Sequence, residues 1–206
     1  MGYLLVAVVS YLIGSVNSAI LVVWLKFHKD VRSGGSGNAG ATNAARTYGL
    51  EAGLITLLGD VLKAVVACLI GKHFAGQDGA AIAGLFCLLG HCWPVFFRFR
   101  GGKGMAAAGG VLAVLDWRLL VVIAVFFVVV YLLWKRVSLS TVLSVLIFPP
   151  LYYFFSDRMT PLSLGVGTVI CLLIVFQHRA NIVRLINGTE PKLHLGHPGN
   201  GKENKY

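Results

Sequence analysis

The sequence predicts an all-α membrane protein that crosses the bilayer seven times, with its N-terminus outside and its C-terminus in the cytoplasm. Of its 206 residues, 57% are hydrophobic and only 13% are charged, and the mean hydropathy is +0.78. A water-soluble domain of this length does not need so much apolar surface. The apolar residues also form long runs separated by short polar or Gly-rich stretches. These properties predict a single domain of membrane-spanning helices over residues 1–190, followed by a flexible tail at 191–206.

Seven apolar segments account for the predicted crossings. They cover residues 3–25, 52–70, 80–97, 105–115, 119–134, 138–155 and 161–177. The fourth has 11 residues; it extends about 16 Å at 1.5 Å per residue and is too short to cross alone. We therefore expect the Gly-rich stretch before it to dip into the membrane, where irregular backbone is tolerated beside a polar cavity. After residue 177 the pattern predicts a short interfacial helix.

The basic residues support the predicted orientation. With the N-terminus outside, fourteen Lys and Arg residues fall on the cytoplasmic side, and only Lys72, Arg118 and Arg158 fall on the other side. Such an excess of Lys and Arg is typical of cytoplasmic loops. The net charge of +10 therefore indicates basic loops at a membrane surface, and we expect no nucleic-acid partner.

Several polar residues lie inside the predicted spans. Asp60 and Lys63 are three residues apart, so they share one helix face and are predicted to pair; alternatively, Asp60 orients a cationic site nearby. Asn17 is expected to form a hydrogen bond between helices, and Pro94 to kink or end the third span. The four cysteines lie in apolar segments without metal-ligand spacing and are expected to be packing residues.

A Gly-rich loop at residues 34–46, GGSGNAGATNAAR, is the first candidate for a binding site. Its glycines allow backbone N–H groups to turn toward one point, and its hydroxyl, amide and guanidinium groups can bind the same anion. The candidate residues are Gly35, Ser36, Gly37, Asn38, Gly40, Thr42 and Arg46. The pattern G-x-G-x-x-G also occurs here, but no strand precedes it, which excludes a dinucleotide-binding fold. A flexible linker is the remaining alternative.

A second Gly-rich cluster, RFRGGKG at residues 98–104, precedes the short fourth segment. A Gly-rich turn that leads into a helix directs amide groups and the positive end of the helix dipole at one place. Gly101 and Gly102 supply the turn, and Lys103 adds a cation. The cluster is not a Walker loop, because Gly104 follows the lysine where Ser or Thr is required.

The predicted topology brings both clusters to one face, together with Ser138, His178 and Asn181. Two anion sites beside a lipid-accessible cavity favour two phosphate-bearing substrates, at least one of them with a fatty chain. These residue types supply positioning and electrostatic stabilisation, and they require neither a metal nor a cofactor. The alternatives are a carrier for an organic phosphate and a structural subunit that binds lipid headgroups.

Three stretches carry a resemblance to a known family: GSGNAGATNAARTYG, GHCWPVFFRFRGGKG and HRANIVRLINGTE. They resemble the signature stretches of the bacterial acyl-phosphate-dependent glycerol-3-phosphate acyltransferases, the PlsY family, over nearly the whole chain. The resemblance implies a seven-span enzyme of the bacterial inner membrane with a cytoplasmic active site. It implies transfer of an acyl group from acyl phosphate to the 1-hydroxyl of glycerol 3-phosphate, which gives lysophosphatidic acid and phosphate.

The resemblance also implies roles for individual residues. Ser36, Arg46 and Lys103 are expected to hold phosphate oxygens, with Asn38, Thr42 and the loop amides completing those sites. Ser138, His178 and Asn181 are expected to orient the attacking hydroxyl or the departing phosphate. A phosphate oxygen of the donor is expected to take the proton; a purely anchoring His178 remains an alternative.

One further motif is interpreted as coincidental. His73 and Asp78 in HFAGQD match the H-x-x-x-x-D motif of unrelated acyltransferases. The predicted topology places them in an outer loop, across the membrane from both Gly-rich clusters, so we expect no role for them in the site.

Overall fold

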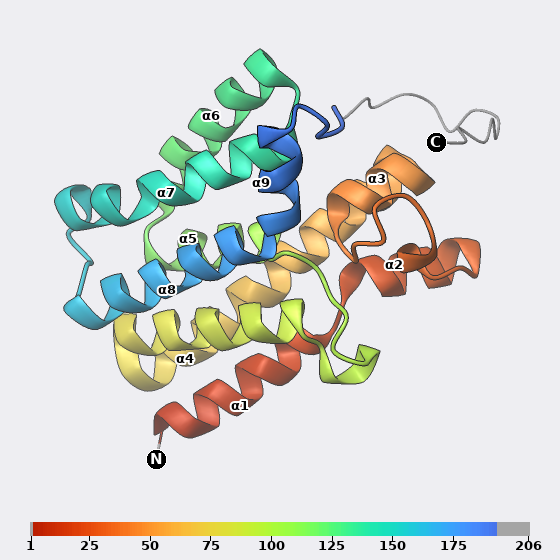
Figure 1. Cartoon of the computed structure of the whole chain (residues 1–206). Coiled ribbons are helices and arrows are strands. Elements are labelled where there is room, and N and C mark those ends of the chain that lie inside the picture. Colours follow the sequence, from red (N-terminus) through yellow and green to blue (C-terminus); the bar gives the residue numbers. More distant parts are fainter. Residues whose placement is uncertain (1, 193–206) are drawn as a thin grey trace.

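The computed structural model describes residues 2–192, and its regular structure is helical throughout this range (Figure 1). The helices are α1 (Gly2–Ser15), α2 (Ser18–Phe27), α3 (Ala41–Tyr48), α4 (Leu50–Cys92), α5 (Met105–Leu115), α6 (Trp117–Trp134), α7 (Val137–Phe155), α8 (Pro161–Gln177) and α9 (Arg179–Ile186). Short 3₁₀ turns at Val31–Ser33 and Val95–Phe97 lie in the loops after α2 and α4. Residues 193–206 of the predicted tail lie outside the described residues.

The first apolar segment, a single candidate crossing, consists of two helices with a break between them. Val16 and Asn17 separate α1 from α2. The Asn17 side chain caps α2 by accepting a hydrogen bond from the backbone N–H of Ile20 at 3.0 Å. Its amide also donates to the carbonyl oxygen of Ala39 at 3.3 Å. Asn17 therefore ties the break to the first Gly-rich loop instead of bridging two helices.

Helix α4 is a hairpin with two arms, residues 50–74 and 77–92. Ala75 and Gly76 have non-helical backbone angles, with a φ of 61° at Gly76. The arms come close together, since a Cβ on Gly71 would lie 2.2 Å from the carbonyl oxygen of Gly79. The arms correspond to the predicted second and third spans. The second arm ends at Cys92, just before Pro94, in agreement with the prediction that this proline kinks or ends the third span.

Close backbone approach also joins α1 to the second arm of α4. A Cβ on Gly14 would lie 2.0 Å from the carbonyl oxygen of Cys87, and one on Gly90 would lie 2.2 Å from that of Tyr11. Helix α4 also packs against α5 and α8, so it occupies the centre of the bundle (Figure 1). Glycines on both helices thus allow the backbones of α1 and α4 to pack closely.

The predicted pairing of Asp60 and Lys63 is confirmed, and the pair has further partners. The Lys63 ammonium lies 2.9 Å from Asp60 Oδ1, and His91 Nδ1 lies 3.4 Å from the same oxygen. Lys63 also donates to the carbonyl oxygens of Gly14 and Val16 at 3.1 and 2.8 Å. These carbonyls lie at the break between α1 and α2, so the buried ammonium stabilises the break.

Four helical segments of the described chain are long and apolar enough to cross a bilayer: Gly2–Phe27, Leu50–Phe97, Trp117–Trp134 and Val137–Phe155. Helices α8 and α9, bent by 58° relative to each other, would together make a fifth. The segment Leu50–Phe97 contains both arms of α4, and α5 has 11 residues as the sequence predicted. The count of seven crossings and their orientation stay predictions.

Substitution at Gly90 tests the close contact between α1 and α4. The Gly90→Val side chain would be forced against the backbone of α1, which costs about 1–3 kcal/mol of stability. We expect a lower midpoint of thermal unfolding in detergent. Gly165→Val is the matched control, because Gly165 is an exposed helical glycine whose Cβ would meet nothing within 4 Å. Equal midpoints for the two variants would contradict the packing described here.

Candidate functional site

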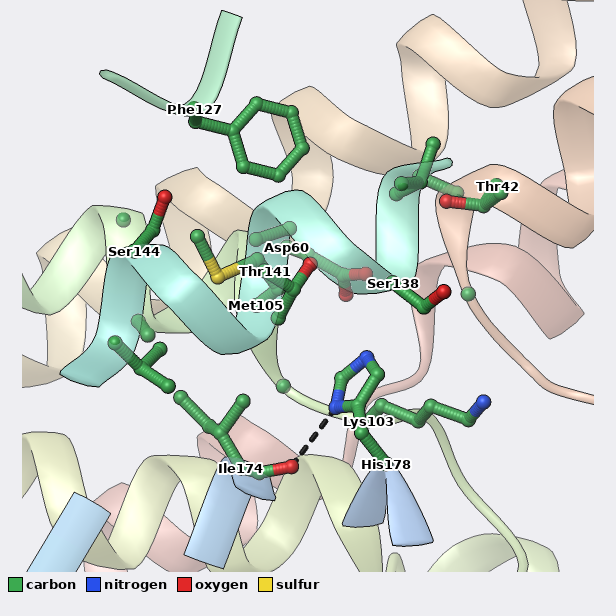
Figure 2. A pocket seen from close by; sticks show the side chains of 18 of the residues that line it. Thr42, Asp60, Lys103, Met105, Phe127, Ser138, Thr141, Ser144, Ile174 and His178 are labelled. Atoms are coloured by element: carbon green, nitrogen blue, oxygen red, sulfur yellow. Dashed lines mark hydrogen bonds between the residues drawn. The ribbon is translucent and has the colours of Figure 1, made fainter. Parts of the chain in front are cut away.

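A cavity of 1470 Å³ lies where the two Gly-rich loops meet α5 and the C-terminal helices. Its polar end is formed by the first Gly-rich loop, Lys103 and the α8–α9 junction, and its apolar part by residues of α4 to α8. Figure 2 shows Ser138 and Thr141 of α7 across the cavity from Lys103 and His178. Pockets for small ligands usually measure about 300–1,000 Å³, so this cavity has room for two substrates.

The cavity brings together twelve of the thirteen site residues that the sequence predicted. The twelve are Gly35, Ser36, Gly37, Asn38, Gly40, Thr42, Arg46, Gly101, Lys103, Ser138, His178 and Asn181. Gly102 is the exception, and it is discussed below. Residues from four separate parts of the chain therefore share one cavity, as the predicted topology required.

The first Gly-rich loop is built around the buried side chain of Asn43. Its Oδ1 accepts hydrogen bonds from the backbone N–H and the hydroxyl of Ser36, at 2.8 and 3.2 Å. Its Nδ2 donates to the carbonyl oxygens of Val31 and Gly34. Gly35 and Gly37 have φ values of 59° and 70°, which glycine adopts without strain. Asn43 was not among the predicted site residues, although it lies in the quoted motif.

These contacts revise the idea that successive amides of this loop face an anion. The N–H of Ser36 is bound by Asn43, and those of Gly37 and Gly40 donate to the carbonyl oxygens of Gly34 and Asn38. These three amides therefore have acceptors within the protein. Helix α3 begins at Ala41, so its first turn also borders the polar end.

The second Gly-rich loop is fixed to the end of α4. The N–H groups of Gly101 and Gly102 donate to the carbonyl oxygens of Cys92 and His91, each at 3.1 Å. A Cβ on Gly102 would lie 2.2 Å from the His91 ring. Both amides thus have acceptors in the protein, which corrects the prediction that they bind phosphate. These glycines instead allow the close approach that places Lys103 at the cavity.

Lys103 lies at the polar end of the cavity with two arginines nearby. Its ammonium donates a hydrogen bond to the side-chain oxygen of Asn181. Burial lowers the pKa of Lys103, and the positive charges of Arg184 and Arg46 lower it further, against the opposing effect of Glu190. A cluster of cations is a favourable place for a phosphate group.

His178 connects α8 to α9 and faces the cavity. Its Nδ1 donates to the carbonyl oxygen of Ile174 at 2.8 Å, the dashed line in Figure 2. A carbonyl oxygen can only accept, so Nδ1 carries the proton in this contact. The neutral ring then offers Nε2 as an acceptor, and Figure 2 shows this nitrogen on the side of α7.

Glu190 is a site residue that the sequence reasoning missed. Its carboxylate accepts hydrogen bonds from Ser138, Asn181 and Arg184, each at 2.7 Å. Burial raises the pKa of Glu190, but these three hydrogen bonds outweigh burial, and the pKa lies below its ordinary value. Glu190 is the last residue of the third quoted stretch, and its place in that stretch could have identified it as a candidate site residue.

Arg32 joins the two Gly-rich loops and was also missed. Its guanidinium is held by Asp30 through hydrogen bonds of 2.7–3.1 Å. The same group donates to the carbonyl oxygens of Phe97 and Arg100 at 3.0 and 3.2 Å. The segment before the first loop is therefore fixed to the segment before Lys103.

His73 and Asp78 do not line the cavity. They lie on either side of the hairpin turn of α4, where Asp78 accepts a hydrogen bond from Thr160. The His73 ring instead contacts the ring of Phe74. The interpretation of their spacing as coincidence agrees with this placement.

The chain is similar to a group of membrane acyltransferases. The family model described as glycerol-3-phosphate acyltransferase matches residues 4–188. Glycerol-3-phosphate acyltransferases of Thermoanaerobacter sp. (strain X514) and Bacillus subtilis (strain 168) are each 42% identical to it. The alignments cover 92% of this chain and 94% and 96% of those proteins, respectively.

Two solved structures of PlsY, an integral membrane glycerol 3-phosphate acyltransferase, share the fold. Its glycerol 3-phosphate form aligns with a TM-score of 0.86 at 31% identity, over 94% of this chain and 96% of that chain. Its lysophosphatidic acid form aligns with a TM-score of 0.82 at 30% identity, over 95% and 97%. The chain therefore belongs to the PlsY family of integral-membrane glycerol-3-phosphate acyltransferases.

Proposed function

We propose that this protein transfers a fatty acyl group from acyl phosphate to the 1-hydroxyl of glycerol 3-phosphate, which yields lysophosphatidic acid and phosphate. The observation that carries the proposal is the single cavity with cations and hydroxyls at one end and apolar walls elsewhere. Its two ends fit a phosphate group and a fatty chain, respectively. The two solved PlsY structures are described as a glycerol 3-phosphate form and a lysophosphatidic acid form. This supports glycerol 3-phosphate as the acceptor and lysophosphatidic acid as the product here.

In this proposal, positively charged groups hold the two phosphates. Arg46 and Lys103 bind phosphate oxygens, and the side chains of Ser36, Asn38 and Thr42 complete the sites with hydrogen bonds. The same charges stabilise the negative charge that develops on the carbonyl oxygen and on the leaving phosphate. Catalysis then depends on positioning and on electrostatic stabilisation, without a covalent intermediate, a metal or a cofactor.

The chemical step forms one bond and breaks another. The 1-hydroxyl oxygen attacks the acyl carbonyl carbon, and the bond from that carbon to the phosphate oxygen breaks. His178 accepts a hydrogen bond from the hydroxyl through Nε2 and thereby orients it. Glu190 is already an acceptor for three protein groups, so we assign it to holding Ser138 and Asn181 in place. The hydroxyl proton leaves with the phosphate of the donor.

We also infer that the protein lies in a bacterial inner membrane with seven crossings and an external N-terminus, so that the cavity's polar end faces the cytoplasm. The two arms of α4 each account for one crossing, and α5 accounts for a short one. The basic loops and the cationic end of the cavity then lie on the same side, as the distribution of Lys and Arg favours.

Purified protein in detergent tests the proposed reaction directly. Given hexadecanoyl phosphate and glycerol 3-phosphate, it is expected to release phosphate and lysolipid in equal amounts. A carrier of organic phosphate would require sealed vesicles and would form no product. Failure to form lysolipid from acyl phosphate, in a preparation that forms it from acyl-coenzyme A, would refute the proposed donor.

Removing either cation tests the electrostatic part of the proposal. We expect Lys103→Ala and Arg46→Ala each to lower kcat/KM by about 100-fold or more, as losses of transition-state stabilisation commonly do. Arg158→Ala, at an exposed turn at the other end of α8, and His73→Ala are the matched controls. Activity within a few-fold of the parent for both Lys103→Ala and Arg46→Ala would remove these residues from the site.

The lowered pKa of Lys103 predicts a pH dependence. A lysine with a lowered pKa loses its proton at a lower pH than an ordinary lysine, whose pKa is 10.5. If the ammonium binds phosphate, kcat/KM falls as the pH rises, and the fall begins below that value. Lys103→Arg should move this fall to higher pH, because guanidinium keeps its charge. An identical alkaline profile in both proteins would contradict the assignment, after correction for hydrolysis of the donor without enzyme.

A further inference from the structure

One face of α5 borders the apolar part of the cavity. Met105, Ala108, Gly109 and Leu112 are spaced at i, i+3, i+4 and i+7, so they form a single stripe along the helix, and all four line the cavity. The opposite wall includes Phe127 of α6, whose ring faces the cavity in Figure 2. Gly109 is the residue of this stripe that has no side chain.

Gly109 and its neighbour Gly110 are glycines for different reasons. A Cβ on Gly110 would lie 2.4 Å from the carbonyl oxygen of Val61 and 2.9 Å from the Cβ of Ala64, so packing against α4 requires a glycine there. A Cβ on Gly109 would meet nothing within 4 Å. Glycine inside a helix costs about 1 kcal/mol relative to alanine. Packing does not account for Gly109, and the volume that a side chain would remove there belongs to the cavity.

The direction of a side chain at position 109 follows from helix geometry. The Cα–Cβ bond of a helical residue tilts toward the N-terminus of the helix. A larger residue would therefore extend beside Met105, toward the loop that carries Lys103. It would narrow the cavity between its cationic end and the apolar region farther along α5, which ends at Leu115. A long acyl chain attached to a phosphate at the cationic end has to pass the part of the cavity beside position 109.

We propose that Gly109 is a specificity-determining residue, which keeps the apolar part of the cavity wide enough for a long acyl chain to pass along α5. The proposal rests on the function proposed above and adds a residue that sets the range of acyl lengths. Short acyl groups end before the narrow place that a side chain would create. Long acyl groups have to cross it, so only these lose binding when residue 109 is enlarged.

The test compares hexanoyl and hexadecanoyl phosphate as donors for the parent, Gly109→Ala, Gly109→Leu and Gly165→Leu. For Gly109→Leu, we expect kcat/KM with the hexadecanoyl donor to fall by about tenfold or more relative to the hexanoyl donor, since one misplaced methylene in an apolar pocket can have this effect. Gly109→Ala should show a smaller change in the same direction. Gly165→Leu places the same side chain at an exposed glycine of α8 and should keep the parent's ratio.

Two results would overturn the proposal: an unchanged ratio in Gly109→Leu, or an equal loss with both donors in both Gly109 variants. If Gly109→Leu does not fold, as judged by thermal unfolding, Gly109→Ala decides the question, and an unchanged ratio in that variant overturns the proposal.

Calorimetry separates this proposal from the proposed function. Absence of turnover of any acyl phosphate by the parent refutes the function. Weaker binding of hexadecanoyl lysophosphatidic acid to the Gly109 variants, with unchanged binding of glycerol 3-phosphate, would still support the role of Gly109. Equal binding of that lysolipid by the parent and by the variants would refute this role.

Discussion

The architecture depends on one buried polar cluster, formed by Asp60, Lys63 and His91. A lysine inside an apolar bundle is costly unless its charge is neutralised and its protons are bound. Here the ammonium has an aspartate beside it and two backbone carbonyls at the break between α1 and α2 as acceptors. The break can exist inside the bundle because this lysine binds the carbonyl groups that the helix leaves without partners.

The same cluster is connected to the two Gly-rich loops by short links. His91 accepts the N–H of Gly102 on its carbonyl oxygen, and its ring lies against the place where a Cβ of Gly102 would be. On the other side, Asn17 binds the carbonyl oxygen of Ala39 in the first Gly-rich loop. Arg32 adds a direct connection between the two loop segments. Irregular backbone at the end of the bundle is thus held by buried polar contacts, which makes a preorganised anion site possible without a large soluble domain.

The features that could be predicted from the sequence are those that depend on local patterns of residues. The bounds of α5 and α8 follow from an apolar run between breakers and from Pro161, and the pairing of Asp60 with Lys63 follows from their spacing on one helix. The convergence of the two Gly-rich loops follows from topology. The resemblance to one family supplied roles for Ser138, His178 and Asn181, and all predicted site residues but Gly102 line the cavity.

What the sequence could not show depends on contacts between distant residues. The break at Asn17 requires the carbonyl of Ala39, and the role of Glu190 requires Ser138, more than fifty residues away. The amides of Gly101 and Gly102 could face either an anion or the end of α4, and only the fold decides this.

Glu190 also has a consequence for the order in which the structure forms during synthesis. Because this carboxylate joins α7 to α9 only after residue 190 has left the ribosome, the earlier helices can insert into the membrane while Ser138 and Asn181 still lack their common acceptor. The hydrogen bonds that join α7 to α9 through Glu190 therefore form only after the helices themselves have been synthesised.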